Sequence, residues 1–208
     1  MRMIFFDVDG VLIHGYHARP ELRQCWDENL PRDFGIDREI FKQNFIMGPF
    51  VTQVLVGQKD LAEALNDFFT AKNLSISADR LIDYWLKNDS HINHDLLAVV
   101  KKLKQEENVR LFIATNQEHN RARYLMNNLG FGEYFDDIFY SARVGHLKPT
   151  AQYFEKIIEA LAISTNDTPV LIDDTPAVVH AARQLGWQAI EYTQVADLKQ
   201  HEILRPFV

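Results

Sequence analysis

The chain has 208 residues, of which 47% are hydrophobic and 25% charged, as in ordinary folded globular proteins. Its formal net charge of −7 argues against a general nucleic-acid binder, which would present a basic surface. No apolar run approaches the roughly 18 residues that a membrane helix needs. Asp7 interrupts the first apolar run, which does not fit a secretory signal, and the single cysteine cannot form an intramolecular disulfide. We therefore expect a cytoplasmic protein that binds neither nucleic acid nor membranes.

Five short apolar runs lack polar alternation and have the length of strands that are buried on both faces of a parallel sheet. These runs are Met3–Phe6, Val109–Ala114, Ile138–Tyr140, Val170–Ile172 and Gln188–Glu191. From residue 95 onward they alternate with helical patterns at Asp95–Glu106, Glu118–Leu129, Ala151–Leu161 and Ala177–Leu185. Gly130 and Gly186 follow two of these helices, where a left-handed residue commonly ends a helix. The alternation predicts an α/β fold with a Rossmann-like open parallel sheet.

Residues 14–90 break this alternation, because they contain helical patterns and no strand-like run. We expect helices at Pro20–Asn29, Arg38–Phe45, Asp60–Ala71 and Ala78–Lys87, with a further helix near Phe50–Val56. A crossover between parallel strands normally needs one helix, so this segment exceeds what the sheet requires. We predict a small α-helical cap at residues 14–90, inserted into a core of residues 1–13 and 91–208. Cys25 is expected to be a packing residue on an amphipathic helix of this cap, and the aromatic residues of the cap are expected to form its core.

Polar residues stand at the ends of the predicted strands. In an open parallel sheet, ligands bind beyond the carboxyl ends of the strands, so side chains from several strand ends meet along one edge. The residues that we expect to converge there are Asp7, Asp9, Thr115, Asn116, Lys148, Asp173 and Asp174.

This residue set suits metal-assisted phosphoryl chemistry. Several carboxylates at one point repel one another unless a cation offsets them. Oxygen ligands without histidine or cysteine favour Mg²⁺, which often bridges to a phosphate. A lysine and a hydroxyl beside the metal suit the other phosphoryl oxygens. One carboxylate is then free to attack phosphorus and form an aspartyl-phosphate, and a second is placed to transfer protons.

Two simpler interpretations explain less of the pattern. A calcium-binding loop beginning at Asp7 would need a ligand at Val11 and a preceding helix, and neither is present. Asp173 and Asp174 could serve only to cap the next helix, but Thr175 and Pro176 suit the N-cap and first helical positions without them. The double acid therefore favours metal binding. His14 and His17 follow the first acid pair, at the point where the chain enters the cap.

The same residues resemble the four motifs of the haloacid dehalogenase-like hydrolase superfamily. "DVDGVL" at Asp7–Leu12 is similar to the first motif, and Thr115-Asn116 to the second. Lys148 in "GHLKP" is similar to the third, and "LIDD", which ends at Asp174, to the fourth. The resemblance covers nearly the whole chain, and the predicted cap is similar to the helical cap of the small-molecule phosphatases in this superfamily.

The resemblance implies a role for each acid. Asp7 would be the nucleophile and a magnesium ligand. Asp9 would be the general acid and base, with its backbone carbonyl on the metal. Asp174 and Asp173 would hold the metal directly or through water.

The resemblance also implies how the phosphoryl group is held. Thr115 and the backbone amide of Asn116 would bind its oxygens, and Lys148 would pair with both the nucleophile and the phosphate. The family often has Asn or Asp four residues after the second acid of its fourth motif, where this chain has Val178. This difference could alter metal affinity or hydrogen bonding in that loop.

The sequence thus predicts a magnesium-dependent phosphatase that hydrolyses a small phosphorylated metabolite, such as a sugar phosphate or a nucleotide, and works as a monomer or homodimer. One alternative is a haloacid dehalogenase-type hydrolase. Asp9 argues against it, because the dehalogenases lack that acid and a halide leaves without a proton. Another alternative is a receiver-like or non-catalytic phosphate-binding domain. A receiver places its acid pair at the first strand, whereas here Asp173-Asp174 closes the fourth strand.

Overall fold

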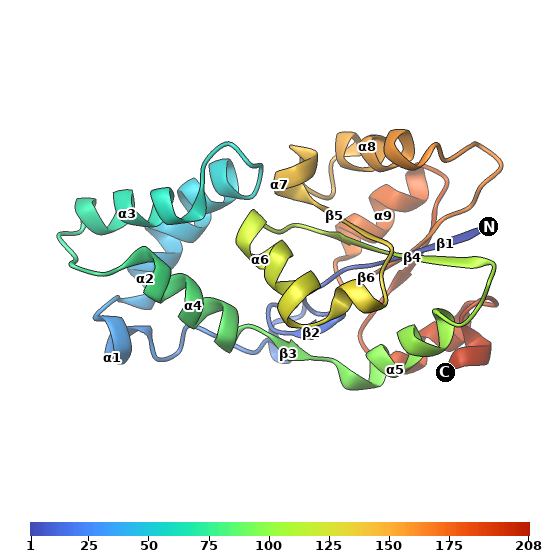
Figure 1. The fold of residues 1–208 in the computed structure, drawn as a ribbon, viewed down its shortest axis with the longest axis horizontal. Coiled ribbons are helices and arrows are strands. Elements are labelled where there is room, and N and C mark those ends of the chain that lie inside the picture. Colours follow the sequence, from blue (N-terminus) through green and yellow to red (C-terminus); the bar gives the residue numbers. More distant parts are fainter.

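A five-stranded sheet forms the centre of the molecule in a computed structural model that describes residues 1–208 (Figure 1). Its order is β5-β4-β1-β6-β7, and every neighbouring pair is parallel. Each of the five predicted runs coincides with a strand, so the predicted α/β fold is confirmed. The strands are β1 (Arg2–Phe6), β4 (Val109–Thr115), β5 (Asp137–Tyr140), β6 (Val170–Asp173) and β7 (Gln188–Glu191).

Both faces of the sheet are buried, because successive side chains of each strand point to opposite sides. Phe5 points to the face covered by α8 (Ala151–Leu161) and α9 (Pro176–Gln184). Ile4 belongs to the opposite cluster, with α5 (His94–Leu103) and the C-terminal turns. Figure 1 shows α8 and α9 above the sheet and α5 below it. This two-sided burial explains why the strands read as continuous apolar runs.

The core helices match the predicted patterns with one difference. The predicted helix Glu118–Leu129 begins as α6 (His119–Arg123) and continues through wider, π-type turns as η3 (Tyr124–Asn128). A short additional helix, α7 (Ser141–Val144), follows β5. Gly130 and Gly186 have φ values of 76° and 84°, as expected of left-handed residues after a helix.

A separate group of helices follows the first strand and lies to the left of the sheet in Figure 1. Thirteen buried apolar residues from this insertion form a cluster of their own, against which Trp85 and Phe50 also pack. The aromatic residues therefore form the insertion's core, as expected. Its helical elements are α1 (Leu30–Phe34), α2 (Arg38–Phe41), η2 (Lys42–Val54, broken at Gly48), α3 (Leu61–Ala71) and α4 (Ala78–Asn88).

The start of the insertion differs from the prediction. Only Pro20–Leu22 forms a helical turn, where a helix over Pro20–Asn29 was expected, and Cys25 is exposed, where a packing residue was expected. A short helix is stable only when it buries an apolar face, and residues 19–25 bury none. Instead, Arg23 donates to the His17 carbonyl oxygen at 2.6 Å and folds this segment back along the chain.

The chain enters and leaves the insertion through a small antiparallel ladder that the sequence did not indicate. β2 (Ile13–His14) pairs with β3 (His91–Ile92). Next to this ladder, Asn93 donates its backbone N–H to Leu12 and its side chain to Val11, both at 2.9 Å. The two connecting segments are thus joined to each other. The division into core and cap at residues 13/14 and 90/91 remains a prediction.

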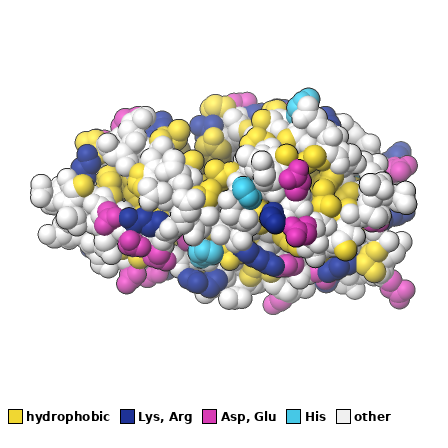
Figure 2. Space-filling model, turned by 90° about the horizontal axis from the view of Figure 1, so that it is seen from above, with side chains coloured by type: hydrophobic (Ala, Val, Ile, Leu, Met, Phe, Trp, Pro, Cys, Tyr) yellow, Lys and Arg dark blue, Asp and Glu magenta, His cyan; other side chains and the backbone are white.

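The surface carries no dominant basic area on the face shown in Figure 2, where Lys and Arg side chains are interspersed with Asp and Glu. This distribution agrees with the negative net charge. None of the helices combines the length and the hydrophobicity that a membrane-spanning segment needs.

Candidate active site

Three neighbouring strands bring their polar residues to one edge of the sheet. Asp7 directly follows β1 at the centre, Thr115 ends β4 on one side, and Asp173 ends β6 on the other, followed by Asp174. These residues are all buried. Carboxylate oxygens of Asp7, Asp173 and Asp174 lie within 4.8 Å of one another. The structure therefore brings these three acids together at the strand ends, as the sequence predicted.

Lys148 supplies a positive charge inside this group of acids. Its ammonium lies 2.9 Å from Asp7 Oδ1 and 2.6 Å from Asp173 Oδ2, and it donates to the Ala114 carbonyl oxygen at 2.8 Å. Burial by itself would lower the pKa of Lys148, but the two carboxylates outweigh this effect and raise it. The lysine is thus a fixed cation beside Asp7.

The two carboxylates that Lys148 contacts differ in what remains free. Asp7 Oδ1 accepts from Lys148 and from the Val8 backbone N–H at 2.8 Å, whereas Asp7 Oδ2 accepts from no protein group. Asp173 is fully engaged, since Oδ2 pairs with Lys148 and Oδ1 accepts from the Thr175 N–H at 2.9 Å. Asp7 is therefore the acid with an oxygen left for a ligand or a reaction.

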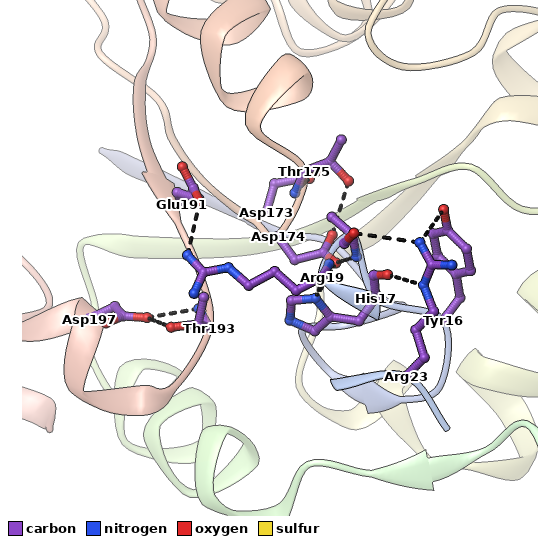
Figure 3. A network of polar contacts seen from close by, with 11 residues as sticks. Tyr16, His17, Arg19, Arg23, Asp173, Asp174, Thr175, Glu191, Thr193 and Asp197 are labelled. Atoms are coloured by element: carbon purple, nitrogen blue, oxygen red, sulfur yellow. Dashed lines mark hydrogen bonds and ion pairs between the residues drawn. The ribbon is translucent and has the colours of Figure 1, made fainter. Parts of the chain in front are cut away.

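Asp174 is held by the segment that leads into the insertion. Its Oδ2 accepts from the Ala18 N–H at 2.6 Å and lies 3.3 Å from His17 Nδ1, and its Oδ1 accepts from the Thr175 hydroxyl at 3.1 Å. Figure 3 shows the His17 ring beside this carboxylate. Gly10, with φ of 76°, approaches so closely that an added Cβ would lie 2.4 Å from Asp174 Oδ2. Only glycine fits this turn.

The crowded acids have the electrostatics of a cation site. Burial is the largest influence on Asp173 and raises its pKa. Lys148 lowers this pKa and the charge of Asp7 raises it, so that the pKa of Asp173 lies at about 7. Burial and the charge of Asp7 also raise the pKa of Asp174. A cation would stabilise the ionised forms, and an all-oxygen ligand set suits Mg²⁺. The three acids could therefore hold a metal ion.

Asp9 lies apart from this cluster and has its own partners. Its Oδ2 accepts from Gln117 Nε2 at 2.5 Å, and its Oδ1 accepts from Arg121 Nη2 at 3.1 Å. Burial raises the pKa of Asp9, and Arg121 opposes this rise while Asp7 adds to it. A raised carboxyl pKa suits a group that gives and takes a proton near neutral pH.

Thr115 and Asn116, which are predicted to bind phosphate, differ from each other in their surroundings. The Thr115 side chain is buried at the end of β4. The Asn116 side chain holds the Lys148 backbone, because Nδ2 donates to the Lys148 carbonyl at 3.0 Å and Oδ1 accepts from its N–H at 2.8 Å. Asn116 thus positions the loop that carries the lysine, and contact of either residue with phosphate remains a prediction.

Val178 belongs to the apolar cluster beneath α8 and α9, together with Phe5 and Leu171. The position at which the resemblance leads one to expect Asn or Asp therefore contributes core packing in this chain. The Asp173-Asp174 loop is held instead by Thr175.

Sequence reasoning gave no role to Gln117, Arg121 or Asp89. Gln117 and Arg121 follow shortly after Thr115-Asn116 in the chain. Their closeness to the end of β4 could have marked them as residues near the site. Asp89 lies between α4 and β3 and ends near the site only through the fold. His17 had been noted for its place after the first acid pair, and its contact with Asp174 gives it a structural role.

Replacing Lys148 by Met should both destabilise the protein and inactivate it. The change leaves Asp7 and Asp173 buried without their cation, which typically costs about 3–5 kcal/mol. Urea unfolding in the presence of a chelator measures this loss. The matched control is Lys156→Met, which removes an exposed lysine on α8 paired only with Glu159. Equal unfolding midpoints for the two variants would show that the Lys148 ion pairs do not stabilise the fold.

Comparison with known proteins supports the sequence resemblance. The family model described as haloacid dehalogenase-like hydrolase matches residues 1–186. Bifunctional epoxide hydrolase 2 of Sus scrofa is 25% identical over 210 residues, which cover 91% of this chain and 36% of that protein. The chain thus spans only about a third of the length of this relative.

Solved structures share the fold at low sequence identity. A HAD family enzyme of Bacteroides thetaiotaomicron, solved as a magnesium complex, is 20% identical with a TM-score of 0.73, and the match covers 93% of each chain. A mutant of that enzyme was solved with magnesium and inorganic phosphate. A 2-haloacid dehalogenase of Pseudomonas syringae is 20% identical with a TM-score of 0.61, covering 92% of this chain and 86% of that one.

The family match extends over most of the chain and includes every strand end that carries an acid of the site. The parallel sheet, the helical insertion after the first strand and the buried acids around Lys148 agree with it. The chain therefore belongs to the haloacid dehalogenase-like hydrolases.

Proposed function

We propose that this protein is a magnesium-dependent phosphatase that hydrolyses a small phosphorylated metabolite through an aspartyl-phosphate on Asp7. The observation that carries the proposal is the environment of Asp7. One of its oxygens is held by Lys148 and by a backbone N–H, while Oδ2 has no protein donor. A carboxylate that is oriented through one oxygen and free at the other suits nucleophilic attack.

The metal would be held by residues already at the strand ends. Asp7 and Asp174 would bind it through carboxylate oxygens, together with the backbone carbonyl of Asp9, and Asp173, which is already paired with the Lys148 ammonium, would act through water. When bound, Mg²⁺ would neutralise charge on the phosphoryl oxygens and on the carboxylates. The close approach of the three acids supports this assignment.

The proposed reaction has two steps that use the same residues. Asp7 Oδ2 attacks phosphorus, the bond from phosphorus to the ester oxygen breaks, and protonated Asp9 gives its proton to that oxygen. Asp9, now a carboxylate, then takes a proton from water as the water oxygen attacks phosphorus. The bond from phosphorus to Asp7 breaks and releases inorganic phosphate. Lys148, with Thr115 and the Asn116 amide, would bind the phosphoryl oxygens.

The solved relatives include both chemistries, so the choice between a phosphatase and a dehalogenase rests on Asp9. The Bacteroides enzyme with magnesium and inorganic phosphate shares the fold, but so does the Pseudomonas dehalogenase. Asp9 favours the phosphatase, because an ester oxygen needs a proton to leave whereas a halide does not. The insertion next to the strand ends would select the substrate, such as a sugar phosphate or a nucleotide.

The direct test is a phosphate-release assay over many small phosphorylated metabolites with Mg²⁺. We expect activity that chelation abolishes and that added Mg²⁺ restores. Halide release from 2-haloacids without phosphate release would establish the dehalogenase alternative. Absence of turnover on the whole panel, together with no Mg²⁺ binding by calorimetry, would favour the non-catalytic alternative.

A further inference from the structure

Arg121 lies between two carboxylates from distant parts of the chain. Its Nη2 donates to Asp9 Oδ1 at 3.1 Å, and its Nη1 lies 3.3 Å from Asp89 Oδ2. The arginine belongs to α6 and is only 5% exposed, an unusual burial for a guanidinium. A buried cation is stable only when it is paired, so Arg121 depends on both acids.

Asp89 belongs to the segment through which the chain returns from the insertion to the core. It follows α4, precedes β3 and is buried. Trp85 Nε1 donates to Asp89 Oδ2 at 3.2 Å, which ties the carboxylate to the last turns of α4. The entering segment also touches it, since a Cβ added to Gly15 would lie 2.7 Å from Asp89 Oδ1. Asp89 is thus enclosed by both connections of the insertion.

These contacts form one chain of interactions from the insertion to Asp9. Asp89 faces Arg121 Nη1, and Arg121 Nη2 faces Asp9. Gln117 holds the second oxygen of Asp9. The guanidinium is constrained from two sides, by the hydrogen bond from Nη2 to Asp9 and by the ion pair, without a hydrogen bond, between Nη1 and Asp89, so a shift of Arg121 moves it relative to Asp9. The orientation of the Asp9 carboxylate is therefore determined outside the acid cluster at the strand ends.

We infer that Arg121 is a positioning residue for Asp9 and is itself held by Asp89, so that the return segment of the insertion sets the orientation of the proposed general acid. This inference rests on the proposed phosphatase function. It concerns proton transfer alone, because Arg121 contacts neither Asp7 nor Lys148 nor Asp174. Phosphate binding should therefore survive its removal.

The test compares Arg121→Met with Arg123→Met. Arg123 is an exposed residue of the same short helix whose guanidinium pairs with Asn120, so it is a matched control. An alkyl phosphate needs a proton on its leaving oxygen, whereas p-nitrophenyl phosphate releases a stable phenolate without one. We expect Arg121→Met to lower the single-turnover phosphorylation rate about 100-fold on the alkyl phosphate, since small misplacements of catalytic groups cost this much. The loss in the phosphorylation rate on p-nitrophenyl phosphate, read from the initial burst, should be only a few fold.

Two further readouts separate positioning from general damage to the fold. KM for the alkyl phosphate and the Kd of inorganic phosphate should stay within about twofold of wild type, because Arg121 does not contact the residues that would bind the phosphoryl group. Arg121→Lys, which keeps a charge, should recover part of the lost phosphorylation rate. If Arg121→Met does not fold, the same kinetic comparison is made with Arg121→Lys and Asp89→Asn.

Asp89→Asn tests the link to the insertion, because the amide keeps the size and the Trp85 partner but removes the charge. It should lower the phosphorylation rate with the same leaving-group dependence, and the double variant with Arg121→Met should be no worse than Arg121→Met alone. Equal losses in the phosphorylation rate on both substrates, additive losses, or an Arg121→Met enzyme that matches Arg123→Met would overturn the inference while leaving the phosphatase standing. A wild type that releases no phosphate would refute the proposed function and this inference with it.

Discussion

Replacing Asp7 by Asn should reduce kcat by about 10⁴-fold or more, because the amide cannot attack phosphorus and no other side chain is placed to do so. The change is isosteric and keeps an oxygen for Lys148 and the Val8 N–H. It also removes a charge that raises the pKa of Asp173 and Asp174 by repulsion. The variant should therefore fold at least as well as wild type without metal, so that lost activity reflects lost chemistry.

Rapid acid quench with a ³²P-labelled substrate provides the measurement. Wild type should carry label on the peptide that contains Asp7, and Asp7→Asn should carry none. Asp167→Asn, at an exposed loop position paired only with Ser164, serves as the control and should behave as wild type. Label retained by Asp7→Asn at wild-type level would assign the nucleophile to another residue.

Replacing Asp9 by Asn should lower turnover by about 10²–10⁴-fold, the usual contribution of general acid–base catalysis. The loss should differ between the two steps. With p-nitrophenyl phosphate the first step needs no proton donor, whereas hydrolysis of the aspartyl-phosphate still needs a base. We therefore expect a burst of nitrophenolate close to one equivalent per enzyme, followed by slow turnover.

Stopped-flow absorbance measures both phases, and the Kd of inorganic phosphate should be unchanged in the Asp9→Asn variant. The amide still accepts from Arg121 through its oxygen, so the local structure should persist. Steady-state turnover equal to wild type would remove Asp9 from the mechanism. It would also weaken the main argument against a dehalogenase, since that argument depends on a proton donor at this position.

Much of this fold could be predicted because its signals are local. Continuous apolar runs such as Val109–Ala114 indicate strands buried on both faces, and the helical periods between them leave an open parallel sheet as the simplest arrangement. Parallel strands also bring their carboxyl ends to one edge. The closeness of Asp7 and Asp173 and the presence of Lys148 near them could therefore be predicted without coordinates, although their catalytic roles remain proposals.

Other features depend on which surfaces meet in space. Residues 20–29 have a helical pattern, yet they form only one helical turn, because residues 20–25 are exposed and bury no apolar face. The exposure of Cys25 follows from the same fact. The short ladder between β2 and β3 is equally invisible in sequence, since two residues per strand carry no periodicity.

Local patterns in the sequence are enough to predict the sheet, the existence of a helical insertion and the acids that end the strands, since each depends on residues close together in the chain. Three contacts are visible only in the folded molecule: Arg121 holds Asp9, Asp89 pairs with Arg121, and the segment entering the insertion binds Asp174. These contacts join residues as far apart as Ala18 and Asp174. Which residues meet depends on how the insertion packs against the sheet, and such long-range pairing leaves no periodic pattern in a single sequence.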